Sequence, residues 1–146
     1  MNDSLLNNKK GKGCGSLMGK LDGLNSFAMD IHQNAIEHGF WTPPYSFGEI
    51  IALCHSELSE ALESYRNNEP LAFVKGTFDG NESQRLETDI NKWEHQKPEG
   101  MAVEMADCII RILDWCAANN VDIEALLIAK HQYNTRREYK HGGKLL

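Results

Sequence analysis

The sequence predicts an all-α protein, a helical bundle of about four main helices with a long insert between the second and the third. Apolar residues recur at helical spacing in four separate stretches, and no stretch sustains the strict apolar–polar alternation of a half-exposed strand. The chain has 146 residues, enough for one domain with its own core. Residues 1–24 are rich in Gly and Lys without periodicity, so we expect a flexible segment there and one domain over residues 25–146.

The first two helices have boundary signals in the sequence. The first is expected over about residues 26–38, where Gly39 ends it. The second begins at Ser46, which forms the pattern of a capping box with Glu49 three residues later, and it closes at residues 67–70. Its expected core stripe consists of Phe47, Ile50, Ile51, Cys54, Leu58, Ala61, Leu62 and Tyr65.

The later elements follow a long connection. Residues 71–99 contain two glycines, a proline and a polar run, and we expect a short helix near residues 82–93 within them. The third helix should run from about Pro98 to Ala118. It is apolar around most of its circumference, which is typical of a buried helix. The fourth is expected from Asp122, as N-cap, to about Arg136.

Composition and charge exclude several classes of protein. The net charge of −6 argues against general nucleic-acid binding. The sequence has no apolar run long enough to span a bilayer and no secretory signal pattern. None of the four cysteines forms a C-x-x-C pair, so we expect a cytoplasmic protein without disulfides or a zinc site. Residues 130–146 are basic, which suits an anionic, metal-bound ligand or a merely solvated tail.

Two pairs of acids have helical spacing. Glu57 and Glu60 are three residues apart at the edge of the second helix's core stripe, and Glu104 and Asp107 are three apart on the only polar strip of the third. If the two helices pack side by side, four carboxylates converge, and a divalent cation would relieve their repulsion. Ligation by oxygen alone suits Mg²⁺ or Mn²⁺.

Simpler interpretations of the same acids stay open. Glu57 and Glu60 are also compatible with surface acids on a helix flank, and Asp107 with Arg111 is compatible with an ion pair four residues apart. A di-iron site is disfavoured because it needs Glu-x-x-His on two helices. Here the residues at positions 60 and 107 are Glu and Asp.

The segments Glu57-Leu-Ser-Glu60 and Glu104-Met-Ala-Asp107 resemble the E-x-x-E … E-x-x-D signature of the MazG-like all-α nucleoside triphosphate pyrophosphohydrolases. The blocks SELSEALE, KPEGMAVEMADCIIRILDWC and KHQYNTRREYKHGGK follow in the family's order, so the resemblance covers about residues 25–146. It implies hydrolysis of (deoxy)nucleoside triphosphates to monophosphate and pyrophosphate, for removal of non-standard or surplus nucleotides. It also implies a homo-oligomer, a dimer or tetramer.

The resemblance also implies roles for individual residues. Mg²⁺, or Mn²⁺, would be held by four acids, and one of them, Glu60, is our candidate for orienting the attacking water. Three residues of the last block would bind the phosphates, although cations at a helix C-terminus are also expected from the helix dipole alone. The metal ligands are Glu57, Glu60, Glu104 and Asp107, and the substrate-binding residues are Lys130, Asn134 and Arg137.

One feature departs from compact members of that family. The stretch between Glu60 and Glu104 is longer, and it would form a lid, a base-contacting element or a surface loop. Its aromatic residues and Trp41 are candidates for stacking on a base, although packing is the simpler role for each. The candidate stacking residues are Trp41, Phe73, Phe78 and Trp93.

The sequence also leaves an alternative function open, that of a non-catalytic helical interaction protein or a nucleotide-binding regulatory protein.

Overall fold

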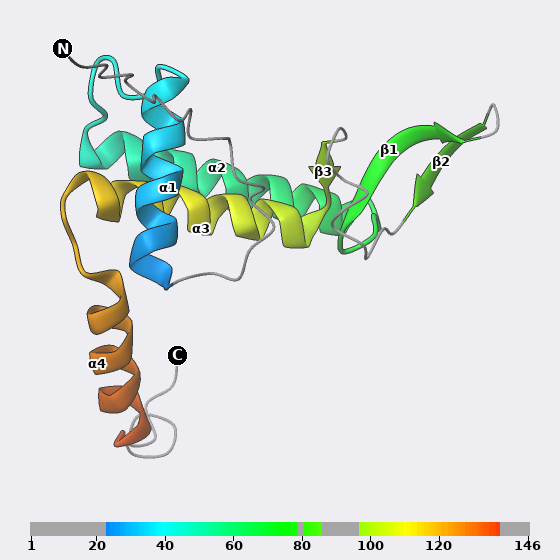
Figure 1. Cartoon of the computed structure of the whole chain (residues 1–146). Coiled ribbons are helices and arrows are strands. Elements are labelled where there is room, and N and C mark those ends of the chain that lie inside the picture. Colours follow the sequence, from blue (N-terminus) through cyan, green and yellow to red (C-terminus); the bar gives the residue numbers. More distant parts are fainter. Residues whose placement is uncertain (1–22, 79–80, 86–96, 138–146) are drawn as a thin grey trace, which may run out of the picture.

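The computed structural model describes residues 23–78, 81–85 and 97–137. Helices dominate this part of the chain, which confirms the all-α class (Figure 1). Residues 1–22 of the segment expected to be flexible lie outside the described residues. The helices are α1 (Leu24–Glu37), α2 (Phe47–Arg66), α3 (Met101–Ala118) and α4 (Ile123–Thr135).

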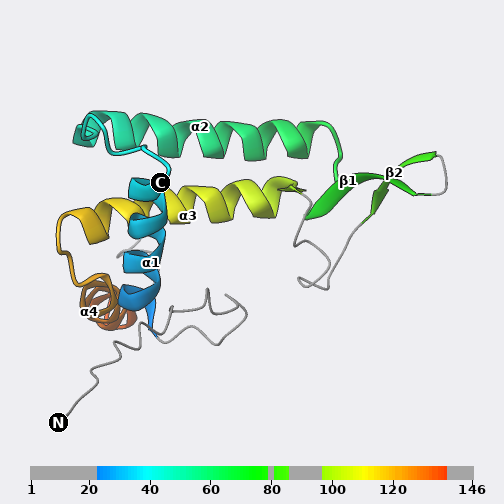
Figure 2. The ribbon, with the colours of Figure 1, turned by 45° about the horizontal axis from the view of Figure 1, so that its top comes forward.

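The centre of the fold is an antiparallel pair of helices, α2 and α3, which lie side by side along most of their length (Figure 2). Ile50 and Cys54 of α2 form a buried cluster with Cys108 of α3. The first helix crosses α3, where Ala28 packs with Leu113 and other α3 residues in a second cluster. Two small clusters that share α3 thus join the helices, and in the described part of the chain the largest fully buried side chains are Phe73 and Val74 of the insert.

The buried face of α2 differs from the expected core stripe. Small side chains at Cys54, Ala61 and Ser64 face α3 and allow the two helices to approach closely. Glu57 lies on the same buried face. The expectation was wrong for five of its residues, which are 42% to 65% exposed in the single chain: Phe47, Ile51, Leu58, Leu62 and Tyr65.

The insert between α2 and α3 contains a small antiparallel sheet. Its strands are β1 (Phe73–Phe78), β2 (Asn81–Arg85) and β3 (Pro98–Glu99), in the order β2-β1-β3. The expected helix near residues 82–93 is therefore wrong at residues 82–85, which pair with β1, and its remainder lies outside the described residues. Pro98 and Glu99 also pair with β1, so α3 begins later than expected, at Met101.

Local features at their first residues fix where α2 and α3 begin. Ser46 and Glu49 form the expected capping box: the Glu49 N–H donates to Ser46 Oγ at 3.3 Å and the Ser46 N–H donates to Glu49 Oε2 at 2.7 Å. Gly100, before α3, has φ +111°, and a Cβ there would lie 2.7 Å from the carbonyl oxygen of Pro70. Only glycine fits this approach, which places the first turn of α3 against Pro70 and Leu71, in the segment after α2.

The fourth helix is attached through its first turn. Asp122 caps it by accepting the N–H of Ala125 at 3.0 Å, as expected for an N-cap. Asn25 of α1 donates its side-chain amide to Asp122 Oδ1 at 2.7 Å, and its Oδ1 accepts the N–H of Ile123 at 3.1 Å. Beyond this joint, no residue of α4 is buried.

Candidate metal site

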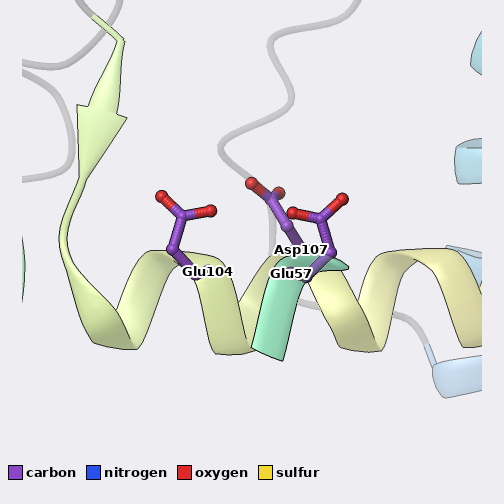
Figure 3. A group of neighbouring side chains, drawn as sticks. All are labelled: Glu57, Glu104 and Asp107. Atoms are coloured by element: carbon purple, nitrogen blue, oxygen red, sulfur yellow. The ribbon is translucent and has the colours of Figure 1, made fainter. Parts of the chain in front are cut away.

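Three of the predicted carboxylates converge between α2 and α3. Glu57 comes from α2 and is buried, whereas Glu104 and Asp107 come from α3 and are half-buried. One ligand oxygen from each residue lies within 4.8 Å of the others. All three side chains point to the same side of α3 (Figure 3). We call these residues the acidic triad, and their oxygens could together hold one metal ion.

The acidic triad is electrostatically unfavourable without a cation. Burial raises the pKa of Glu104, and repulsion by Glu60, Asp107 and Glu57 raises this pKa further, while Lys97 lowers it. The folded chain thus disfavours the ionised form of Glu104. A divalent cation placed among these oxygens would reverse that preference.

A protein cation already lies beside one member of the triad. Arg111 of α3 donates its Nε–H to Glu57 Oε1 at 3.1 Å, and its Nη2 lies 3.1 Å from the same oxygen. Arg111 thus pairs across the two helices with Glu57, whereas the alternative interpretation of the sequence paired it with Asp107 on its own helix. This contact compensates the buried charge of Glu57.

Glu60, the fourth predicted ligand, lies outside the triad. Its carboxylate is exposed and accepts a hydrogen bond from Ser56 Oγ at 3.2 Å. Together with Glu104 it lines a pocket of about 340 Å³ between the end of α2 and the start of α3. We call it the acidic pocket, because five carboxylates and one ammonium line it: Glu60, Glu63, Glu69, Glu99, Glu104 and Lys97.

The predicted phosphate-binding residues lie elsewhere in the single chain. Lys130, Asn134 and Arg137 are exposed on or just after α4. This helix stands off from the α2–α3 pair at the end of α3 farthest from β3 (Figure 1). Glu104 is in the first turn of α3, so about 20 Å of helix separates it from the residues that lead to α4. One chain does not bring these three residues to the acidic triad.

Asp114 lies on the polar strip of α3, as its spacing in the sequence predicts, although no functional role was predicted for it. Trp41 donates its Nε1–H to both carboxylate oxygens of Asp114 at 3.0 Å, and His32 Nδ1 lies 2.7 Å from Asp114 Oδ1. Trp41, a candidate for base stacking, thus joins its loop to α3. Phe73 is fully buried, and the side chains of residues 78 and 93 lie outside the description. The spacing of positions 104, 107, 111 and 114, three or four residues apart, is the sequence feature that places Asp114 on the same face of α3 as the triad residues.

Comparisons with protein-family models, with curated proteins and with solved structures give no match for this chain. None of the described helices has the length and apolar character needed to cross a membrane. The fold and the site define the class of protein. It is an all-α protein with a carboxylate cluster, suited to a metal ion, between two antiparallel helices.

Proposed function

We propose that this protein is a Mg²⁺-dependent hydrolase of (deoxy)nucleoside triphosphates that releases monophosphate and pyrophosphate and removes unwanted nucleotides. The observation that carries the proposal is the convergence of Glu57, Glu104 and Asp107. They belong to the two segments whose sequence resembles the MazG-like signature. A donor set of carboxylate oxygens suits Mg²⁺ or Mn²⁺ better than softer metals. Together, the geometry and the sequence pattern support metal-assisted phosphoryl chemistry.

The chemistry follows from the charges of the site. Glu57, Glu104 and Asp107 would hold a divalent cation, which would offset their negative charge and supply Lewis-acid activation of phosphate and water. Arg111 holds Glu57 Oε1 and so fixes the orientation of this carboxylate. The carboxylates of the acidic pocket repel a bare anion, so the pocket favours a polyphosphate that carries its own cation. Glu60 is exposed beside this pocket and outside the triad, where it would accept a proton from the attacking water.

We further propose that the protein is a homo-oligomer, because α2 and α3 share an uncovered apolar face. Cys54 and Cys108 mark where the two antiparallel helices face each other. At 100° per residue, the exposed apolar residues of α2 and of α3 lie on the same side of this contact, and the acidic triad lies on the opposite side. Eight half-exposed side chains offer roughly 700 Å² of apolar surface, near the ~800 Å² per partner of a standard interface. The face consists of Phe47, Ile51, Leu58, Leu62, Tyr65, Met105, Ile109 and Ile112.

The function is tested by incubating the protein with a panel of nucleoside triphosphates and Mg²⁺ and measuring pyrophosphate. We expect release from at least one nucleotide, with a loss of at least about 100-fold in Glu57→Gln and Glu104→Gln. Glu37→Gln, in an exposed pair on α1, is the matched control and should retain activity. Absence of cleavage across the panel would overturn the hydrolase proposal.

The same panel distinguishes the alternatives. A nucleotide-binding regulatory protein would show nucleotide-dependent thermal stabilisation without any product. A helical interaction protein would show no change in melting temperature with nucleotide or Mg²⁺. The uncovered apolar face is the observation that keeps this second function in view.

A further inference from the structure

Arg111 borders the acidic triad on α3. It follows Asp107 by four residues, and residues at this spacing are neighbours on the surface of a helix. Long side chains on a helix point back toward its N-terminus, so the guanidinium of Arg111 reaches toward Asp107. Its hydrogen bond to Glu57 Oε1, at 3.1 Å, agrees with this direction, because Glu57 converges with Asp107. The triad side chains point to this same side of α3 (Figure 3).

The contact with Glu57 occupies only one edge of the guanidinium. Nε and Nη2 both lie 3.1 Å from Glu57 Oε1, and no described residue accepts a hydrogen bond from Nη1. The Arg111 side chain is 35% exposed, so the guanidinium is not sealed inside the helix pair. The fork of N–H donors of an arginine matches the oxygens of a carboxylate or a phosphate. One edge of the fork is therefore available to an anion.

The acidic triad needs a further cation even when a metal ion is bound. Its three carboxylates carry more negative charge than one divalent cation offsets. An anionic ligand would therefore still be repelled at the occupied site, and the carboxylates of the acidic pocket would add to this repulsion. A fixed guanidinium beside the triad offsets the excess and attracts an anion.

We propose that Arg111 binds a phosphate group of the substrate through the free edge of its guanidinium, beside the metal ion that the triad holds. The ligand class is a phosphate anion accompanied by a divalent cation. Because Glu57 already holds the guanidinium in place, little side-chain freedom is lost when the anion binds. The identity of the substrate as a nucleoside triphosphate rests on the proposed function, whereas phosphate binding requires no turnover.

This phosphate subsite is tested with inorganic pyrophosphate as the probe, without any activity measurement. Isothermal titration calorimetry first gives the Kd of Mg²⁺ alone for each variant. Pyrophosphate is then titrated as its Mg²⁺ complex into protein at free Mg²⁺ well above that Kd. We expect Arg111→Gln to bind pyrophosphate about 10- to 100-fold more weakly than the wild type, because hydrogen bonds between charged groups are lost.

The Mg²⁺ titration separates this role from a merely structural one. Arg111 repels a metal ion, so Arg111→Gln should bind Mg²⁺ more tightly while it binds pyrophosphate more weakly. Unchanged pyrophosphate affinity would mean that Arg111 only compensates the charge of Glu57. Weaker binding of both Mg²⁺ and pyrophosphate would mean that it only holds Glu57 in place. Either result would overturn the proposal, as would a wild type that does not bind pyrophosphate in Mg²⁺.

Two variants serve as controls. Arg66→Gln removes the same charge from an exposed position of α2, about 14 Å along the helix from Glu57, and should bind pyrophosphate like the wild type. An equal loss in Arg66→Gln and Arg111→Gln would indicate a general charge effect and overturn the proposal. Arg111→Lys keeps the charge without the fork and should lose about 2- to 10-fold in pyrophosphate affinity. If Arg111→Gln does not fold, unchanged affinity in Arg111→Lys would overturn the proposal.

Nucleotide cleavage distinguishes this proposal from the proposed function. If the wild type cleaves a nucleotide, Arg111→Gln should lower kcat/KM by about the factor that it loses in pyrophosphate affinity. Cleavage by Arg111→Gln with the wild-type kcat/KM would overturn the phosphate subsite and leave the proposed function standing. If the wild type cleaves no nucleotide but Arg111→Gln loses pyrophosphate affinity, the proposed function fails and the phosphate subsite stands.

Discussion

Arg111 and Glu57 face each other across the α2–α3 interface, with both Nε and Nη2 of the arginine 3.1 Å from one oxygen, Glu57 Oε1. The Glu57 side chain is only 9% exposed, while that of Arg111 is 35% exposed. A buried carboxylate beside two others thus has a protein counter-charge on one of its oxygens. The same contact positions this carboxylate toward Glu104 and Asp107.

Removing the arginine should make the fold depend on metal. In Arg111→Gln the buried Glu57 loses its cation, which should lower the free energy of unfolding by about 1–3 kcal/mol in a chelator, because one partner of a largely buried pair remains uncompensated. Mg²⁺ should restore more stability to this variant than to the wild type. Thermal melts with chelator and with Mg²⁺ measure both effects, and Arg111→Lys should behave closer to wild type. Equal Mg²⁺ responses in wild type and Arg111→Gln would contradict the prediction.

Metal binding should stabilise the folded chain through the acidic triad. At free Mg²⁺ about 100 times its Kd, binding adds about 2.7 kcal/mol to the free energy of unfolding. Asp107→Asn should lose most of this gain, since it removes one of the converging carboxylates. Glu37→Gln, in an exposed pair with Gln33 on α1, should keep it. Calorimetric titration with Mg²⁺ provides the Kd values, and an unchanged Kd in Asp107→Asn would exclude this site.

The raised pKa of Glu104 sets the direction of a pH effect. Burial and then the neighbouring Glu60 raise this pKa above 4.5, so the folded state holds the proton more tightly than the unfolded state. The resulting stability is complete below pH 4.5 and is lost as pH rises through the raised pKa. In chelator, the unfolding free energy of the wild type relative to Glu104→Gln should fall across that window and then level off. Urea titrations at several pH values measure it, and parallel curves for the two proteins would refute it.

A charge on the apolar face should separate the copies. Leu58→Glu places a carboxylate among apolar side chains that are about half exposed in one chain, and burying it against a second copy would be costly. We expect a monomer by sedimentation velocity with unchanged helix content by circular dichroism. Met29→Glu, at a slightly more exposed position on α1 outside that face, is the control. Identical sedimentation of wild type and Leu58→Glu would mean that this face is not the interface.

Asp114 should matter for stability rather than for metal binding. Asp114 is buried and accepts hydrogen bonds from Trp41 and His32, so Asp114→Ala leaves two donors without their acceptor. We expect this change to lower the free energy of unfolding by about 2–4 kcal/mol. Asp30→Ala, at an exposed position of α1, should cost much less. Denaturant midpoints measure the difference. A loss of Mg²⁺ affinity in folded Asp114→Ala would instead show that the site extends along the strip.

Helix positions were largely predictable because their signals are local. The Ser46–Glu49 box and the Asp122 cap stand where the sequence placed them, and α1 starts and ends within two residues of expectation. Hydrogen bonds of a helix join residues four apart, so neighbouring residues decide them.

Strand β2 was missed although its pairing with β1 is local: Phe78 pairs with Asn81, and the two residues between them in the sequence, Asp79 and Gly80, are a typical hairpin signal. The polar composition of residues 81–85 hid the strand, because it lacks the apolar alternation of a half-buried strand.

By itself, the sequence determined where the four main helices lie and that two acidic pairs stand at one-turn spacing on the second and third of them. Tertiary structure alone decided which face of α2 is buried, that Arg111 pairs with Glu57, and that α4 stands away from the triad. The reason is that helical spacing is local, whereas burial and ion pairing depend on contacts across the fold, here between residues 54 positions apart.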